Sequence, residues 1–206
     1  MTDYFALLNQ PRRPWLDEES LKGRFLAKST EVHPDRLHQA AKEERDEATR
    51  RYAELNAAYN SLREPKDRLQ HLLFLEHGAK PSGIDSVPEE LMGLFMEAGR
   101  LCQEVDAFLA ERSMISSPLI KVQMFERGME WTDKLNEFQR KLNLRRTALE
   151  EELKRMNPLW DTAPPVGHAD RAASLPLNDL NNCYRAASYL SRWMGQLQER
   201  AVKLAL

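Results

Sequence analysis

Residues 17–65 read DEESLKGRFLAKSTEVHPDRLHQAAKEERDEATRRYAELNAAYNSLREP, with two amphipathic helical patterns on either side of a polar segment. Asp17 is a favourable N-cap, and the two glutamates after it complement the positive end of a helix dipole. The first pattern predicts a helix from Asp17 to about Val32. Pro34 ends this helix, because proline disfavours helical backbone in the residue before it. The second pattern predicts a longer helix with one apolar face, formed by Ala48, Tyr52, Leu55, Tyr59 and Leu62.

Short segments flank this pair of helices. Residues 3–8 predict a brief apolar turn, and Pro65 interrupts the second helix. A further turn or two is expected over residues 68–75. A linker rich in glycine and proline follows, from Gly78 to Gly83. We therefore expect an N-terminal domain over residues 1–80.

Three long amphipathic patterns follow, over residues 88–111, 118–156 and 177–204. Ser117 and Pro118 form the preferred start of the middle helix, with a cap followed by proline at the first helical position. Residues 157–175, between the last two helices, are expected to form a loop unusually long for a bundle. Amphipathic helices cannot bury their apolar faces singly, so an antiparallel three-helix bundle is expected over residues 84–206. The predicted fold class is all-α.

The composition excludes several function classes. The chain has 30 Lys and Arg against 32 Asp and Glu, and this near-balance argues against binding to a nucleic-acid duplex. Its 8 glycines form neither a dinucleotide-binding nor a P-loop motif. No uninterrupted apolar run approaches the ~20 residues that span a bilayer, so a cytoplasmic protein without membrane association is expected.

Neither a metal site nor a catalytic site is indicated. Cys102 and Cys183 stand outside any CxxC or Cys/His spacing, so both are expected to be buried apolar residues. Four scattered histidines give no metal geometry, and we expect none to be functional; they are His38, His71, His77 and His168. No arrangement of nucleophile and base is apparent. A protein without enzymatic activity, cofactor or metal is therefore expected.

The tripeptide His33-Pro34-Asp35, followed by Arg36, lies at the exit of the first predicted helix and before the second. In this context the sequence resembles the J domain, the module that activates DnaK-type chaperones. Asp3-Tyr4-Phe5 and Leu55-Asn56-Ala57-Ala58-Tyr59 also fall where that family has them.

The J-domain resemblance implies that His33, Pro34, Asp35 and Arg36 dock on the chaperone and favour its hydrolysis-competent state. Lys22 and Arg24 are the basic residues that the preceding helix offers for docking. Lys28 stands where the family usually has a core leucine, so we expect it either to snorkel or to lie on a shifted face of the helix. A simpler alternative is that Pro34 only terminates the helix and Asp35 caps the loop.

The resemblance extends to the HscB type, the co-chaperone of iron–sulfur cluster assembly, which places a three-helix bundle after a J domain. Leu72-Leu73, followed by Leu75, His77 and Gly78, is similar to its domain junction. The apolar patch that holds the IscU scaffold in this family is matched by Leu91, Met92, Phe95 and Tyr189. Met96 adds a further adaptable apolar side chain.

The HscB resemblance implies a co-chaperone that stimulates a DnaK/HscA-type ATPase and delivers an IscU-like scaffold protein. Two alternatives remain open. The J domain could serve a different client, because the client patch is only partly matched, and Leu91, Met92 and Phe95 could each belong to the bundle core. Alternatively, the chain could be a helical interaction scaffold whose J domain is degenerate.

Overall fold

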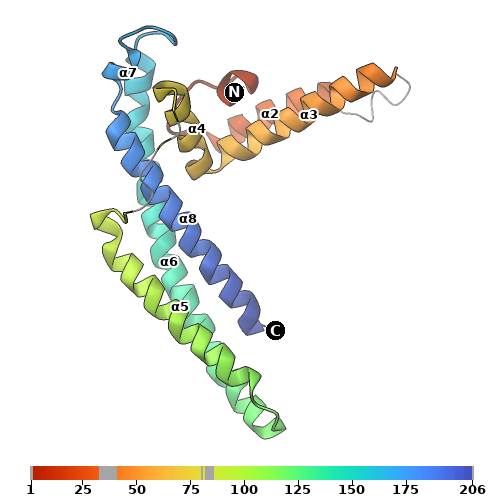
Figure 1. Ribbon diagram of the computed structural model, residues 1–206, viewed down its shortest axis with the longest axis vertical. Helices are drawn as coiled ribbons and strands as arrows, with labels where there is room; N and C mark the ends of the chain where they lie inside the picture. Colours follow the sequence, from red (N-terminus) through yellow and green to blue (C-terminus); the bar gives the residue numbers. More distant parts are fainter. Residues whose placement is uncertain (1, 33–40, 80, 82–85, 206) are drawn as a thin grey trace. The chain divides into compact units, whose positions relative to one another are not determined.

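The computed structural model describes residues 2–32, 41–79, 81 and 86–205, and every regular element in these ranges is helical (Figure 1). The chain divides into two compact units. The N-terminal unit contains Met1–Ser82 and Glu152–Tyr184, and the bundle unit contains Gly83–Glu151 and Arg185–Leu206. Within the described ranges, no helix combines the length and the apolar character that crossing a membrane would require.

The N-terminal unit begins with α1 (Tyr4–Leu7) and the pair α2 (Glu18–Glu31) and α3 (Lys42–Arg63). The predicted cap of α2 is confirmed, because the Asp17 carboxylate accepts the backbone N–H of Ser20 at 2.8 Å. α2 packs against α3, where the rings of Phe25 and Tyr59 stack with centroids 4.4 Å apart. Three residues of the predicted apolar face of α3 are buried, namely Ala48, Leu55 and Leu62, whereas Tyr52 and Tyr59 are partly buried. The expected helical pair is therefore present.

Pro65 starts a new helix instead of only interrupting the previous one. α4 (Pro65–His77) has proline in its first turn, where the missing N–H would have no helical partner anyway. Gly78, in the left-handed conformation at φ 75°, ends the helix and donates its N–H to the Phe74 carbonyl at 2.8 Å. The expectation of a turn or two over residues 68–75 was therefore too short.

A buried arginine holds the segment between α1 and α2 in place. Arg68 is 4% exposed, and its Nε donates to the carbonyl of Pro14 at 2.8 Å. Its Nη1 donates to the carbonyl of Leu62 at 2.8 Å, near the end of α3. The guanidinium thus satisfies backbone acceptors that the fold would otherwise bury without a donor.

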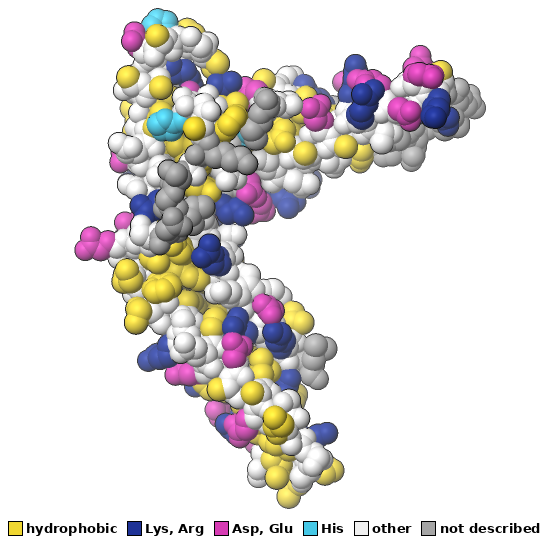
Figure 2. Space-filling view, viewed as in Figure 1, with side chains coloured by type: hydrophobic (Ala, Val, Ile, Leu, Met, Phe, Trp, Pro, Cys, Tyr) yellow, Lys and Arg dark blue, Asp and Glu magenta, His cyan; other side chains and the backbone are white. Residues whose placement is uncertain are grey.

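The bundle unit contains the 3-10 turn η2 (Glu89–Leu91), α5 (Met92–Ser113), and parts of α6 (Pro118–Thr162) and α8 (Leu177–Ala205). Its core lies between these helices and is apolar; it includes Leu101, Val105, Phe108, Leu135, Phe138, Leu142, Leu190, Trp193 and Leu197. Arg112 of α5 donates to the carbonyls of Leu204 and Lys203, at the C-terminal end of α8, where a cation complements the helix dipole. Hydrophobic side chains also gather on the surface over the start of α5 and over the α5–α6 turn (Figure 2).

The division into units differs from the expected domain of residues 84–206, because residues 152–184 pack with the N-terminal helices. α6 continues past its expected end at Met156, through Pro158, to Thr162, and α7 (Arg171–Ser174) lies within the expected 157–175 loop. Contacts distant in sequence account for this difference. Asn157 accepts the N–H of Trp15 at 3.1 Å and donates to its carbonyl at 3.0 Å.

α7 is joined to α4 by a buried ion pair. The Arg171 guanidinium donates to both carboxylate oxygens of Glu76, at 2.8 and 2.9 Å, and to the carbonyl of Pro164 at 2.7 Å. The side chains of Arg171 and Glu76 are only 8% and 2% exposed. This bidentate geometry is the strong form of an arginine–carboxylate contact, and it fixes α7 on α4.

Candidate functional site

The predicted chaperone-binding residues belong to α2 and to the segment between α2 and α3. His33, Pro34, Asp35 and Arg36 lie outside the described residues. Lys22 and Arg24 are both exposed on α2 and available to a partner. The role of the six residues stays a prediction.

Lys28 snorkels as expected. Its side chain is partly buried, and its Nζ donates to the Asn9 side-chain oxygen at 3.1 Å. The aliphatic part of the side chain is partly buried, while the ammonium group reaches the Asn9 side chain. Lys28 can therefore replace an apolar residue without burying its charge.

The predicted client patch divides into an exposed part and a buried part. Met92 and Phe95 are 46% and 41% exposed, and Met96 extends the same surface with 65% exposure. Leu91 is fully buried, and its side chain belongs to the core below the patch. These residues lie in η2 and the first turns of α5, where spacings of three and four place Met92, Phe95 and Met96 together on the surface.

An aromatic row on α8 supports the patch from below. The Phe95 ring lies 6.4 Å from that of Trp193, and the Trp193 ring lies 5.6 Å from that of Tyr189. Tyr189 and Trp193 are 6% and 3% exposed, so Tyr189 is buried beside the tryptophan and is not part of the exposed patch. The Arg192 guanidinium lies 5.4 Å from the Tyr189 ring centroid, within cation–π range.

Trp193 was not among the residues predicted for the patch. Its signal was present in the sequence, because Trp193 follows Tyr189 by one helical turn and lies on the same face of the last helix. A tryptophan side chain has a large apolar area and only two rotatable χ angles, so it can form a rigid support with little loss of side-chain entropy. Trp193 therefore lies beneath the Phe95 ring as part of the support of the patch.

Two ion pairs join η2 and α5 to α6 beside the patch. Arg145 contacts Glu90 at 3.0 Å, and Lys141 contacts Glu97 at 2.7 Å. The hydrogen bond that Lys141 donates to the Glu97 carboxylate raises the pKa of Lys141, which favours the charged form of the lysine. An apolar centre with a charged rim is the usual anatomy of a protein-binding surface.

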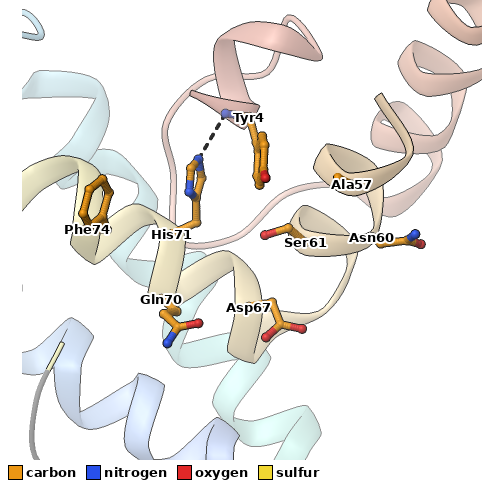
Figure 3. Close-up of a pocket in the computed structure, with 8 residues that line it drawn as sticks. All are labelled: Tyr4, Ala57, Asn60, Ser61, Asp67, Gln70, His71 and Phe74. Carbon is orange, nitrogen blue, oxygen red and sulfur yellow. Dashed lines mark hydrogen bonds between the residues drawn. The ribbon is translucent and has the colours of Figure 1, made fainter. Parts of the chain in front are cut away.

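A pocket lies in the N-terminal unit (Figure 3). It has a volume of about 380 Å³ and is lined by Tyr4, Ala57, Asn60, Ser61, Asp67, Gln70, His71 and Phe74. Gln70 already donates to the Tyr184 hydroxyl at 3.2 Å. The Nε2 of His71 accepts the backbone N–H of Tyr4 at 3.0 Å and is therefore not free to act as a base toward Ser61. The pocket offers no assembled catalytic arrangement.

His71 instead holds α1 on α4. Its ring stacks on that of Tyr4 with centroids 4.5 Å apart, and it accepts one of the N–H groups in the first turn of α1 that lack a helical partner. His71 is 4% exposed. Burial lowers the pKa of His71 below its ordinary value of 6.5, with the Asp3 carboxylate acting in the opposite direction and Arg12 in the same direction.

This arrangement predicts a pH-dependent stability. Below pH 6.5 the unfolded chain binds a proton at His71 that the folded state resists, so the free energy of unfolding falls as the pH drops through that range. Thermal melts at pH 7.5 and 5.5 should therefore differ less for His71→Gln than for the wild type. His77→Gln, a change at an exposed histidine of the same helix, is the control and should keep the wild-type difference. An unchanged pH difference in His71→Gln would contradict this role.

In the part of the chain that the structure describes, no three His, Cys, Asp or Glu side chains are grouped as metal ligands. The features that remain as candidates are the exposed basic residues Lys22 and Arg24 on α2 and the exposed apolar patch on α5.

Comparisons with known proteins agree with this description. No family model matches the chain. The co-chaperone protein HscB of Proteus mirabilis (strain HI4320) is 31% identical over 108 residues, which are 50% of this chain and 59% of that protein. The chain therefore matches less than two thirds of the length of this curated relative.

Solved structures extend the similarity to the whole fold. The crystal structure of human co-chaperone protein HscB aligns with 97% of this chain and 82% of its own length, at 18% identity and a TM-score of 0.55. Chaperone HscB from Vibrio cholerae aligns with 95% of this chain and 99% of its own length, at 23% identity and a TM-score of 0.47. The chain thus resembles HscB co-chaperones in sequence over half its length and shares their fold, an N-terminal J domain followed by a C-terminal helical bundle.

Proposed function

We propose that this protein is a J-type co-chaperone of iron–sulfur cluster assembly, which stimulates a DnaK/HscA-type ATPase and delivers an IscU-like scaffold protein to it. The observation that carries the proposal is the His33-Pro34-Asp35 motif, which lies between the paired helices α2 and α3 in a chain similar to HscB. The supporting observation is the exposed apolar patch of Met92, Phe95 and Met96.

Stimulation of the chaperone requires binding alone. A J domain that binds the hydrolysis-competent state of the chaperone more tightly than the other state shifts the population toward it. A tenfold shift needs a difference in binding free energy of about 1.4 kcal/mol. Lys22 and Arg24 contribute positive charge on α2, which speeds the encounter with an acidic surface.

The scaffold would bind the patch on α5. Phe95 and the two methionines offer apolar area that a partner can cover, and Trp193 fixes the position of the aromatic ring. Large, well-supported aromatic side chains carry a disproportionate share of binding energy at protein interfaces. The flanking pairs Glu90–Arg145 and Glu97–Lys141 would form the polar rim and restrict the orientation of the partner.

A reconstituted ATPase assay tests the proposal. The wild-type chain is added to purified HscA and, in parallel, to DnaK, each with and without the IscU scaffold. Stimulation by the chain that increases with IscU supports the proposal. Stimulation without any effect of IscU would indicate a different client, and no stimulation of either chaperone would indicate a helical scaffold with a degenerate J domain.

The patch gives a separate prediction. Met92→Ala combined with Phe95→Ala should weaken IscU binding about tenfold or more, because the aromatic anchor is lost. Both side chains are only partly buried, so we expect each truncation to lower the free energy of unfolding by about 1 kcal/mol. A binding titration and a thermal melt on the same sample measure both effects.

Two variants control this experiment. Leu144→Ala removes a side chain that is 73% exposed on α6 and should leave IscU affinity and stability unchanged. Leu91→Ala removes a fully buried side chain and should lower the free energy of unfolding by about 2–5 kcal/mol. Normal IscU affinity in a folded Met92→Ala/Phe95→Ala variant would remove the patch from the proposal.

A further inference from the structure

A second exposed apolar surface lies on the N-terminal part of α6. Leu119, Val122, Phe125 and Met129 are 75%, 61%, 68% and 57% exposed. Their spacings of three, three and four residues place them in one row, here called the α6 stripe. Single exposed apolar residues are ordinary, but a contiguous row marks an interaction site.

The α6 stripe faces away from the core of the bundle unit. Met124 and Leu135, on the opposite side of α6, are 3% and 2% exposed. On that side Gly128 lies against Phe108, where a Cβ at the glycine would meet the ring at 3.8 Å. The stripe therefore makes no contribution to the core that would explain its apolar character.

A row of carboxylates runs along one edge of the stripe. Glu126 follows Val122 by one turn, and Glu130 and Asp133 continue the row at spacings of four and three. All three acidic side chains are exposed. This gives the apolar stripe a negative edge.

Two nearby basic side chains are already engaged elsewhere. Arg127 contacts the Glu111 carboxylate at 2.8 and 3.0 Å, and Lys134 places its Nζ 3.9 Å from the centre of the Trp131 ring. The hydrogen bond from Arg127 lowers the pKa of Glu111, which keeps this pair charged at neutral pH. The negative edge of the stripe is therefore only partly offset by these cations.

We infer that the α6 stripe is a docking surface for an amphipathic helical segment of a partner protein, with Lys or Arg along one edge of its apolar face. The apolar residues of the segment cover Leu119, Val122, Phe125 and Met129, and its cations meet Glu126, Glu130 and Asp133. Helices commonly bind in this way, through anchors spaced three, four and seven residues apart. The phenylalanine and the methionine suit a surface that adapts to its partner.

The charge pattern favours this occupant over two others. In a symmetric antiparallel pair of stripes, the carboxylates at the C-terminal end of one stripe would face the N-terminal end of the other, where residues 115–119 offer no cation, so a second copy would leave them unpaired. An anionic membrane surface would repel the same edge. A basic amphipathic segment covers the apolar stripe and pairs its cations with the carboxylates at the edge.

This surface is separate from the patch on α5. Met96 lies near the start of α5 and Ser113 at its end, about 25 Å apart at 1.5 Å per residue. Figure 2 shows hydrophobic side chains over both regions of the bundle unit. The inference does not depend on the proposed co-chaperone function, and a partner bound to the stripe leaves the α5 patch accessible.

Two model peptides test the inference on the full chain. Each has about 18 residues with leucine at helical spacing, and one carries lysine where the other carries glutamate. We expect the lysine peptide to bind about tenfold or more tightly than the glutamate peptide in fluorescence anisotropy at about 0.15 M salt. The double change Phe125→Ser/Met129→Ser should weaken binding of the lysine peptide about tenfold. Met96→Ser, in the patch on α5, should leave this binding unchanged.

A charge reversal gives the sharpest test. Glu126→Lys with Glu130→Lys should reverse the preference, so that the glutamate peptide binds more tightly than the lysine peptide. Equal binding of both peptides, or binding unaffected by the Phe125→Ser/Met129→Ser change, would overturn the inference. A wild-type dimer in sedimentation that Phe125→Ser dissociates, or stronger binding to vesicles with anionic lipid than to the lysine peptide, would assign the stripe to a different occupant and overturn it too.

Discussion

Replacing His33 with glutamine is expected to return the ATPase rate of the partner chaperone to its unstimulated value. The J-domain resemblance places His33 in the motif that contacts the chaperone, and the shift toward the hydrolysis-competent state depends on that contact. Glutamine keeps a polar side chain of similar length but loses the imidazole ring. The measurement is the steady-state ATPase rate at saturating co-chaperone concentration. At saturation, a variant that only binds the chaperone more weakly still stimulates the ATPase, whereas a variant that has lost the activating contact does not.

His38→Gln is the matched control, because it makes the same change five residues away at a histidine to which the motif assigns no role. It should stimulate the chaperone as the wild type does. IscU binding should be the same in both variants, since the patch on α5 belongs to the other unit. If His33→Gln stimulates at the wild-type rate while retaining its helical content, the assignment of the motif is wrong.

Arg171→Met is expected to produce a large loss of stability in the N-terminal unit. The change leaves the Glu76 carboxylate, which is 2% exposed, without its bidentate partner. Removing one member of a buried ion pair costs about 3–5 kcal/mol, because the remaining charge stays desolvated. A denaturant titration followed by circular dichroism should show the N-terminal unit unfolding at a lower concentration.

A second variant distinguishes the buried charge from a simple loss of packing. Arg171→Met combined with Glu76→Leu should recover most of the lost stability, since two apolar side chains can replace a buried ion pair at little cost. Arg51→Met removes an exposed pair with Glu47 and should change stability by less than about 0.5 kcal/mol. Wild-type stability of Arg171→Met alone would show that the ion pair does not stabilise the unit.

Local patterns predicted most of the helices. Asp17 caps α2 through a residue only three positions away, and the apolar spacing in α3 repeats within a few turns. Pro118 opens α6 by a preference that depends on its own ring. Each signal needs only neighbours along the chain, so the amino-acid sequence alone is enough to interpret it.

Features that depend on distant residues could not be predicted in this way. The continuation of α6 through Pro158 accompanies the contacts of Asn157 with Trp15 and the burial of Trp160, and the sequence at 157–162 gives no local sign of them. The site shows the same limit. Helical spacing placed Met92 and Phe95 together, but the burial of Leu91 and the support from Trp193 depend on packing between helices.

The discontinuous N-terminal unit has a consequence for folding during synthesis. Trp15 and Glu76 meet their partners Asn157 and Arg171 only after another 142 and 95 residues, respectively, have left the ribosome, roughly 5–30 s later at ordinary translation rates. During that interval the surface that α6 and α7 later cover stays open. Contacts this far apart in sequence also slow folding, because a long loop must close before they form. The nascent chain therefore passes through a stage in which its N-terminal unit is incomplete and open to unwanted association.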